Sequence, residues 1–438
     1  MKKVLCLGAG LVAHPFVQYL TNHGFHVIVA SRTKNKADRL IEGCKNAESV
    51  AFNIKTDDKL LDELTNKADL VCSLLPYTYH VKAAKIAIKN KTHFCTTSYI
   101  SDEMRGLEDE ANAAGIILLN ECGVDPGIDH MSAQKIIDEI HKNDGEIRSF
   151  TSFTGGLPAP EANNNPFGYK LSWSPRGVLL AGRNDAHFLR NGKQIKIPGL
   201  ELFDNYEIIE IPNLGKFEGY PNRDSMSYID IYKIPETKTM LRGTLRNLGW
   251  CTTMKKITDI GLLNLEETSF EKMTYADLMR CLVGTKEHDL RKATAKKTDL
   301  SVDDPIISRL KWLGLFEHQA IPLGINTNLD ALCFLFEEKL QYSTGERDML
   351  VMHHEFIAEF SDHAERITST MIDYGIPNGD SSMSRTVALP VAIATRMILE
   401  GEINLTGVHR PVSPELYQPI LRELEKTDIF LEEHRIRI

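Results

Sequence analysis

Several features that define large classes of protein are missing from this sequence. No run of about 18 consecutive apolar residues occurs, so we expect no membrane-spanning helix and no membrane partner. The 51 Lys and Arg residues are outnumbered by 60 Asp and Glu residues, the net charge is −9, and the pI is near 6.0. This balance argues against bulk binding of nucleic acid, but it leaves room for a small cationic pocket that takes an acidic metabolite.

Patterns for disulfides, metal ions and serine hydrolases are also absent. The eight cysteines are scattered without a C-x-x-C pair, and the apolar run Val4–Leu7 is too short for a signal peptide, so we expect a reduced, cytoplasmic protein. The segment Met352–Glu355 lacks the H-E-x-x-H spacing of a helical metal site, and no G-x-S-x-G sequence occurs. We therefore expect no bound metal, and a hydrolase is disfavoured.

The N-terminal part of the chain alternates short apolar runs with amphipathic stretches. This alternation is typical of β-α-β units around a doubly wound parallel sheet, and 438 residues provide for two or three domains. Helices are expected between the strands, for example over Ala83–Lys89 and Asp102–Ala114. The predicted strands are Lys3–Leu7, His26–Ala30, Val50–Phe52, Asp69–Leu75, His93–Thr97 and Ile116–Asn120.

The pattern changes after Gly127. A helix is expected around Ile128–His141, and β-branched and aromatic runs at Tyr206–Ile211 and Met226–Ile234 then indicate an antiparallel sheet. The sequence from about Phe270 to Leu340 is helical and charged, and its basic segment, residues 291–297, is interpreted as a solvated helix face. Two further helices are predicted near the C-terminus, over Leu389–Leu399 and Pro414–Lys426.

A glycine motif follows the first predicted strand. Gly8, Gly10 and Ala13 have G-x-G-x-x-A spacing, in which Gly8 permits a tight turn and Gly10 lets the backbone approach a pyrophosphate. Ala13 is small enough for the helix to pack closely on the strand, and the helix N-terminus attracts phosphate. Because the motif lies between a strand and a helix, it predicts a Rossmann-type dinucleotide-binding domain, and Leu11 and Val12 complete the loop.

The residues after the second strand bear on the choice of dinucleotide. An NAD site usually has Asp or Glu at this point for the ribose 2′-hydroxyl, whereas this sequence has Ser31, Arg32 and Thr33. A guanidinium between two hydroxyls suits a 2′-phosphate, so we expect NADP(H). The alternative is that Arg32 only begins a solvated helix.

Polar residues gather where three later strands end. Ser98 and Tyr99 follow the fifth strand, and Asp125 follows the sixth, at the edge of the sheet where ligands bind in α/β folds. An alternative role for Asp125 is to cap the next helix, with Pro126 as its first residue. His80, which follows the fourth strand, is interpreted as an ordinary hydrogen-bonded histidine.

The second half of the chain has two short polar segments that contain arginine. They are Tyr220–Ser225, which contains Arg223, and Arg242–Arg246. Guanidinium groups beside hydroxyls are suited to binding carboxylates with paired hydrogen bonds. With a dinucleotide domain present, these segments favour an acidic substrate, although surface salt bridges would also account for either segment alone.

Longer motifs make a resemblance specific. These motifs are Leu74–His80, Gly123–His130, Gly155–Pro160, Gly168–Ser174, Tyr220–Ser225, Gly243–Arg246 and Pro390–Thr395. Through them the sequence resembles the saccharopine dehydrogenases of the NADP-dependent, L-glutamate-forming type over nearly its whole length. Two departures are minor: Ala13 replaces a third glycine, and Thr154 stands where some relatives have cysteine.

The resemblance implies an architecture and an assembly. It implies a dinucleotide-binding domain over residues 1–126 and a mixed α/β substrate and dimerisation domain over 127–390, with a helical insertion at about 252–345. Residues 391–438 would return toward the first domain, and the protein would be a homodimer.

The resemblance also implies a site. The implied cofactor-binding residues are Gly8, Gly10, Leu11, Val12, Ala13, Ser31, Arg32, Thr33, Ser98, Val124, Asp125, Pro126 and Ser174. The implied substrate-binding residues are Ser98, Tyr99, Asp125, Arg223, Thr244, Leu245 and Arg246.

The implied substrate, saccharopine, carries three carboxylates. Its oxidation to an imine and hydrolysis to glutamate and aminoadipate semialdehyde would need proton transfer, for which Asp125 and Tyr99 are the candidates. A related imine reductase, such as carboxynorspermidine dehydrogenase, would need more acidic residues and fewer arginines in its pocket. A catalytically silent NADP-binding regulator would need neither arginine segment.

Overall fold

The computed structural model describes all residues from 1 to 438 and divides them into two compact units. Unit 1 comprises residues 1–146, 360–363 and 368–435, and unit 2 comprises residues 147–359, 364–367 and 436–438. No helix in either unit has both the length and the apolar character needed to cross a membrane.

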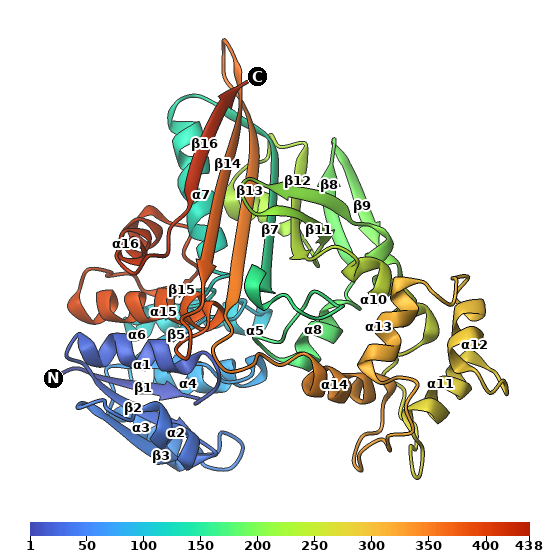
Figure 1. Cartoon of the computed structure of the whole chain (residues 1–438). Coiled ribbons are helices and arrows are strands. Elements are labelled where there is room, and N and C mark those ends of the chain that lie inside the picture. Colours follow the sequence, from blue (N-terminus) through green and yellow to red (C-terminus); the bar gives the residue numbers. More distant parts are fainter. The chain divides into compact units, whose positions relative to one another are not determined.

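Unit 1 is built on a seven-stranded sheet with the order β15-β6-β5-β4-β1-β2-β3 (Figure 1). Every neighbouring pair in this sheet is parallel. Strands β1 to β6 have the order of a Rossmann-type sheet, so the predicted fold class is confirmed. The strands are β1 (Lys3–Leu7), β2 (His26–Ser31), β3 (Ala47–Ala51), β4 (Leu70–Ser73), β5 (His93–Thr96), β6 (Ile117–Leu119) and β15 (Gly407–His409).

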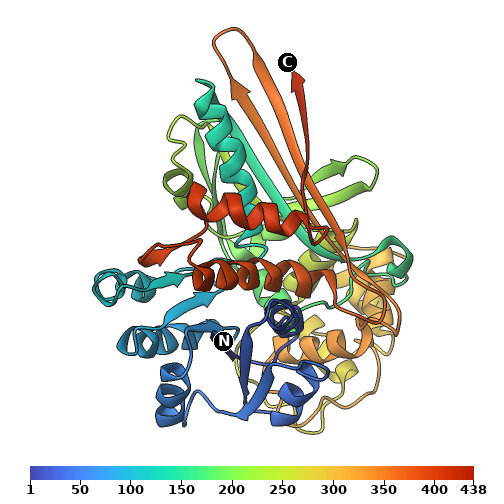
Figure 2. The ribbon, with the colours of Figure 1, turned by 90° about the vertical axis from the view of Figure 1, so that its left-hand side faces the viewer.

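Helices cover both faces of this sheet. On one face Leu5, Val71 and Phe94 pack in a core cluster that includes alanines of α4 and α6. On the other face Cys6, Cys72 and Cys95 are neighbours in register across β1, β4 and β5, and α15 packs against β4, β5 and α1 (Figure 2). The helices of unit 1 are α1 (Ala13–Asn22), α2 (Lys34–Leu40), α3 (Asp58–Asn66), α4 (His80–Lys89), α5 (Asp102–Arg105), α6 (Glu108–Ala114), α7 (Ile128–Lys142), α15 (Ser382–Glu400) and α16 (Pro414–Glu425), with the 3-10 helix η1 (Tyr77–Tyr79).

The C-terminal part of the chain belongs to unit 1, and it adds a strand that was not predicted. β15 pairs with β6 as a seventh parallel strand, with Val408 opposite Leu118. Two further strands near the C-terminus, β14 (Ala364–Tyr374) and β16 (Glu432–Arg437), are neighbours in the second sheet of the chain.

The predicted helix over Asp102–Ala114 is interrupted, because α5 ends before Gly106 and α6 begins at Glu108.

Unit 2 contains a mixed sheet. Its strands follow the order β10-β11-β12-β7-β13, and β8 pairs with both β12 and β9. β12 runs antiparallel to β11 and β8 but parallel to β7, so the sheet is mixed and the predicted antiparallel sheet is only partly right. The strands are β7 (Glu146–Pro158), β8 (Ala186–Arg190), β9 (Lys193–Ile197), β10 (Glu207–Ile211), β11 (Gly215–Pro221), β12 (Thr239–Arg246) and β13 (Asp348–Glu359).

One predicted strand of unit 2 is wrong. The run Met226–Ile234 contains α9 (Ser227–Tyr232) instead. Asp224 accepts hydrogen bonds from the backbone N–H groups of Met226 and Ser227, which starts the helix, and Tyr228 and Tyr232 are buried at helical spacing. A β-prone composition was overridden by a local cap and by burial of one helix face.

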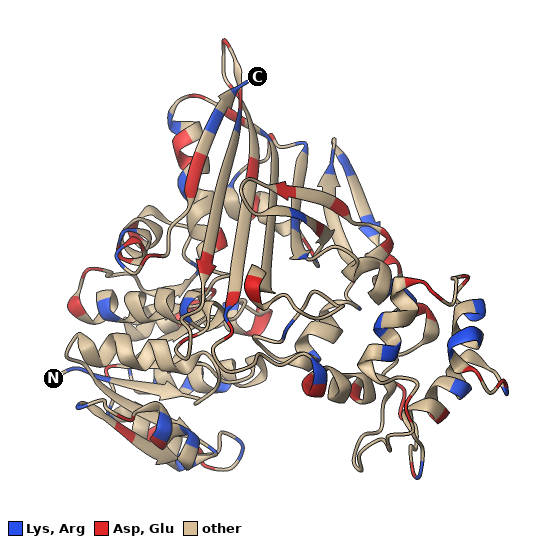
Figure 3. Cartoon of the chain, viewed as in Figure 1, with Lys and Arg blue, Asp and Glu red and all other residues tan.

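The predicted helical segment of unit 2 is confirmed. Its basic part forms α12, where Asp289 caps the N-terminus and Leu290, Ala293 and Ala295 are buried, so the lysines lie on the outer face (Figure 3). The helices of unit 2 are α8 (Pro175–Ala181), α9, α10 (Trp250–Ile260), α11 (Tyr275–Val283), α12 (Leu290–Lys297), α13 (Pro305–Leu313) and α14 (Asn328–Lys339), with the 3-10 helices η2 (Pro160–Ala162) and η3 (Gly199–Asp204).

Candidate active site

A cavity of about 320 Å³ lies at the carboxyl ends of β1, β2 and β4. Gly8 has φ +114°, and a Cβ atom there would come within 3.0 Å of the Leu74 carbonyl oxygen, so the tight turn requires glycine. Gly10 has nothing within 4 Å of its Cβ position, which leaves room for a ligand to reach the backbone. Both glycines line the cavity, as the motif predicts.

The N-terminus of α1 is open to an anion. No side chain caps this helix, and its first turn contains no acidic residue. Only the Ala13 N–H group is engaged near the start of the helix, by the Gly10 carbonyl oxygen at 3.2 Å. The other N–H groups of the first turn and the helix dipole therefore favour a phosphate at this end.

The residues after β2 fit the 2′-phosphate of NADP. Ser31, Arg32, Thr33 and Lys36 all line the cavity, and Arg32 is exposed and makes no ion pair. Helix α2 begins at Lys34, so Arg32 precedes the helix and does not form part of its solvated face. Two cations without acidic partners, beside two hydroxyls, are the donor set that a phosphate ester needs.

Tyr99 and Asp125 meet at the carboxyl ends of β5 and β6. The Tyr99 hydroxyl donates to the Asp125 carboxylate at 3.3 Å, and Tyr99 is 37% exposed. The two segments are joined because the Glu121 N–H group donates to the Ser98 carbonyl oxygen at 3.0 Å. The two candidate proton carriers therefore touch each other directly.

Asp125 does not cap the following helix. Helix α7 begins at Ile128 with Gly127 at the N-cap position, and Asp129, not Asp125, accepts the Gly127 N–H group at 2.6 Å. Gly127 has φ +147°, and a Cβ atom there would lie 2.0 Å from the Gly123 carbonyl oxygen. The capping alternative is therefore wrong, and Asp125 lies in a tight turn with a cis peptide bond to Pro126.

A buried charged network supports this turn. Glu121 contacts His130 Nε2 at 2.8 Å and Arg410 at 3.1 Å, and it accepts the Ile100 N–H group at 3.0 Å. Burial acts to raise the pKa of Glu121, but the hydrogen bond and charge of His130 and the charge of Arg410 outweigh it, and the pKa is lowered. The segment that carries Asp125 is thereby fixed to the segment that carries Tyr99.

Unit 2 contains a buried arginine without a carboxylate partner. Arg246 is 4% exposed, and its Nε has no hydrogen-bond partner. Its guanidinium lies 5.0 Å from the centre of the Tyr169 ring and 5.5 Å from that of Trp250, and one N–H donates to the Leu245 carbonyl oxygen. Burying a cation in this way is costly unless an anion completes its hydrogen bonds.

The acidic residue that lies opposite Arg246 in the sheet forms its hydrogen bonds with other residues. Glu218 lies opposite Arg246 on β11, yet its carboxylate accepts the N–H groups of Gly249 and Cys251, each at 2.7 Å. It thus holds the start of α10 instead of pairing with Arg246. The Trp250 indole N–H group is also buried without a partner. This arrangement leaves donors available for a ligand carboxylate.

The other predicted site residues of unit 2 differ in environment. Thr244 lies opposite Tyr220 in the sheet, and burial raises the pKa of Tyr220 to about 12. Arg223 is exposed, has φ +54° and makes no ion pair, whereas Leu245 is buried. Ser174 is the N-cap of α8 and accepts the Gly177 N–H group at 3.2 Å.

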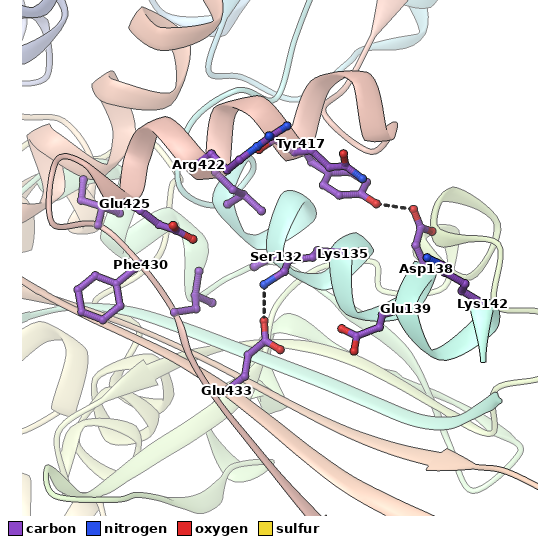
Figure 4. A pocket seen from close by; sticks show the side chains of 14 residues that line it. Ser132, Lys135, Asp138, Glu139, Lys142, Tyr417, Arg422, Glu425, Phe430 and Glu433 are labelled. Carbon is purple, nitrogen blue, oxygen red and sulfur yellow. Dashed lines mark hydrogen bonds and ion pairs between the residues drawn. The ribbon is translucent and has the colours of Figure 1, made fainter. Parts of the chain in front are cut away.

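A second cavity, of about 390 Å³, lies between α7, α16 and β16 in unit 1. Three of its charged groups are engaged, since Lys135 contacts Glu433 at 2.8 Å and Tyr417 donates to Asp138 at 2.7 Å (Figure 4). None of the predicted site residues lines it. It is therefore separate from the candidate site.

Comparisons with known proteins agree with this geometry. The family model described as "Saccharopine dehydrogenase NADP binding domain" matches residues 4–119, and "Saccharopine dehydrogenase C-terminal domain" matches residues 123–429. Together with the glycine loop and the open helix N-terminus, these matches define an NADP-dependent oxidoreductase.

Individual relatives make the assignment specific. A saccharopine dehydrogenase [NADP(+), L-glutamate-forming] of Schizosaccharomyces pombe is 42% identical over 100% of this chain and 99% of its own. The apo structure of saccharopine dehydrogenase (L-Glu forming) from Saccharomyces cerevisiae is 41% identical, with a TM-score of 0.92 and full coverage of both chains. Bovine alpha-aminoadipic semialdehyde synthase is 38% identical over 98% of this chain and 47% of the longer relative. The chain belongs to the saccharopine dehydrogenase family.

A more distant likeness concerns the fold alone. A homospermidine synthase of Legionella pneumophila, solved with NAD, has a TM-score of 0.59 at 9% identity and covers 99% of this chain.

Trp250 and Glu218, which lie near Arg246, were not among the predicted site residues. The indole and the carboxylate come from α10 and β11, and only the packing of the sheet brings them near Arg246. Tyr169 lies in one of the motifs that carry the resemblance, but its tilted contact with Trp250, with ring centres 4.7 Å apart, did not follow from that motif.

We predict that Arg32→Ala raises the KM for NADPH by about 10- to 100-fold, because a charged hydrogen bond to phosphate contributes about 1.5–3 kcal/mol. The KM for NADH should stay unchanged, since NADH lacks the 2′-phosphate. Arg39→Ala provides a matched control, because Arg39 also belongs to this segment but does not line the cavity. Equal effects of Arg32→Ala on the two cofactors would remove Arg32 from the phosphate site.

Proposed function

We propose that this protein interconverts saccharopine, NADP⁺ and water with L-glutamate, 2-aminoadipate 6-semialdehyde, NADPH and a proton, as an enzyme of lysine metabolism. Full-length relatives named for this reaction at about two-fifths identity support the assignment. The structural observation that carries it is Arg246, a buried guanidinium beside aromatic rings with no protein carboxylate to pair with. A substrate with several carboxylates supplies the missing partner.

The reaction divides between the cofactor and the protein. NADP⁺, when bound, accepts a hydride from the carbon beside the secondary amine of saccharopine. The substrate becomes an imine, water adds to it, and the C–N bond of the resulting carbinolamine breaks to give the amine of glutamate and the aldehyde. The chain itself must bind the carboxylates, orient the reacting carbon and move protons.

Two sets of residues are proposed to bind the substrate. Arg246 and Arg223 would each bind one carboxylate, with added hydrogen bonds from Thr244 and contact with Leu245. Ser98, Tyr99 and Asp125 would contact the part of the substrate that meets the nicotinamide, while Ser98, Val124, Asp125, Pro126 and Ser174 would also contact the cofactor. The absence of an ion pair at either arginine supports their role as carboxylate ligands.

Proton transfer is assigned to Asp125 and Tyr99. Their direct hydrogen bond lets a proton pass between the phenol and the carboxylate without a further group. The tight turn around Gly127 and the Glu121 network hold the pair in place.

We also propose the wider organisation that the resemblance implies. The dinucleotide-binding domain would be residues 1–126, the substrate and dimerisation domain 127–390 with an insertion at about 252–345, and the returning segment 391–438. The enzyme would act as a cytoplasmic homodimer, and sedimentation velocity would test the dimer.

The proposed reaction is tested by following NADPH oxidation with glutamate plus aminoadipate semialdehyde, beside the same assay with polyamine aldehydes. We expect turnover with the first pair and at most trace activity with the second. Turnover of only the polyamine aldehydes would replace the proposal by a related imine reductase, and NADPH binding without any turnover would indicate a regulatory protein.

We predict that Arg246→Met lowers the affinity for saccharopine by about 100-fold, through loss of a bidentate carboxylate contact. The free energy of unfolding should change by no more than about 1 kcal/mol, because an unpaired buried charge is replaced by an apolar side chain of similar length. Isothermal titration and urea unfolding measure the two effects. Arg190→Ala, which breaks an exposed pair with Glu207, should leave saccharopine affinity unchanged. A destabilised Arg246→Met protein with normal affinity would contradict this role.

We predict that Asp125→Asn lowers kcat by about 10²- to 10⁴-fold and alters its pH profile, because Asn cannot exchange a proton. Steady-state kinetics across pH would measure both effects, with Asp138→Asn on α7 as a control outside the site. An increase in the KM for saccharopine with an unchanged kcat and pH profile would mean that Asp125 only binds substrate.

A further inference from the structure

We propose that His80 is a positioning residue, which fixes the hydroxyl group of Ser98 so that Ser98 donates its proton to the bound substrate or cofactor. This inference rests on the proposed function, because it assumes that Ser98 contacts a ligand. His80 is the first residue of α4, and it lies next to the carboxyl ends of β4 and β5.

The imidazole of His80 links three hydroxyl groups. It is 4% exposed, its Nδ1 lies 2.9 Å from Ser73 Oγ, and its Nε2 lies 2.8 Å from Ser98 Oγ. Nε2 also lies 3.2 Å from Thr96 Oγ1. Both ring nitrogens are therefore engaged, and Ser98 makes no other side-chain hydrogen bond within the protein.

The direction of each hydrogen bond follows from counting protons. The Ser73 hydroxyl is fully buried, and His80 Nδ1 is its one partner, so its single proton must go to Nδ1 to avoid a buried, unpaired donor. The Thr96 hydroxyl donates to the Ser73 carbonyl oxygen at 2.9 Å, so it has no proton left for the ring. The ring proton therefore lies on Nε2 and is donated to Ser98 Oγ.

This tautomer determines what Ser98 does. Because Ser98 Oγ accepts from His80, its own proton points away from the imidazole and is available to a ligand oxygen. Burial lowers the pKa of His80 to about 4, so the ring is neutral near neutral pH and Nδ1 keeps the lone pair that Ser73 needs. Ser98 is thus a donor with a fixed orientation, suited to a carboxylate or amide oxygen.

The tautomer is tested directly by nitrogen NMR of the protein with ¹⁵N-labelled histidine. The His80 signals are identified as those that disappear in His80→Gln. We expect the shift of an unprotonated Nδ1 and a protonated Nε2, and the opposite tautomer would overturn the inference. This readout is independent of activity, so it decides the inference even if the enzyme does not accept saccharopine, a result that would refute the proposed function alone.

The positioning role of His80 is tested by two substitutions whose side-chain amides differ in how far they extend toward Ser98. His80→Asn places an amide near Nδ1 and cannot reach Ser98, so kcat/KM for saccharopine should fall by about 10-fold. His80→Gln places its amide N–H near Nε2 and should recover most of that loss. Adding Ser98→Ala to His80→Asn should cost little more, since the two residues act together.

A matched control comes from the same sheet. His93 begins β5 at the opposite edge, where its Nδ1 accepts the Ile117 N–H group at 3.2 Å, so His93→Asn should leave kcat/KM unchanged. Thermal unfolding identifies any His80 variant that fails to fold. Unchanged kinetics in a folded His80→Asn enzyme, or a full additional loss from Ser98→Ala, would contradict the positioning role.

Discussion

Parallel pairing of the strands in unit 1 is the constraint on which the candidate site depends. Because β1, β4, β5 and β6 all run in one direction, the loops that follow them emerge at one edge of the sheet. In register, Leu7 pairs with Ser73 and Ser73 pairs with Thr96, so the glycine loop, the His80 network and the Ser98 loop begin at the same level. Small residues on one face, such as Cys72, let α15 pack close to β4 and β5.

A second principle is that the protein leaves some buried polar groups without a hydrogen-bond partner where a ligand is expected. Most buried charges in unit 1 are paired, as Glu121 is with His130 and Arg410. Arg246 in unit 2 is the opposite case, because the acid across the strand from it binds the start of α10 instead. The difference separates a network that stabilises the fold from a group that is held ready for an anion.

Much of unit 1 could be predicted from the sequence because its signals are local. The glycine motif, the apolar strands and Arg32 after the second strand act through neighbouring residues, and the structure places them as expected. The pairing of β15 with β6 joins segments that are far apart in the chain, so no local pattern indicated it. The sequence Asp125-Pro126 has the composition of a helix start, yet the close approach of Gly127 to Gly123 makes a turn instead.

The same distinction between local signals and tertiary contacts explains why two features of unit 2 were not predicted. Met226–Ile234 has the composition of a strand, and the cap from Asp224 and the buried tyrosines make it a helix. The environment of Arg246 depends on where Glu218 and Trp250 lie, which is decided by tertiary packing.

The most direct test of this account is a crystal structure of the protein with NADP⁺ and saccharopine. The account predicts a carboxylate of saccharopine in bidentate contact with Arg246, the 2′-phosphate of the cofactor at Arg32, and the Ser98 hydroxyl within hydrogen-bond distance of a ligand oxygen. A complex in which saccharopine leaves Arg246 without an anion, or in which the 2′-phosphate lies away from Arg32, would contradict it.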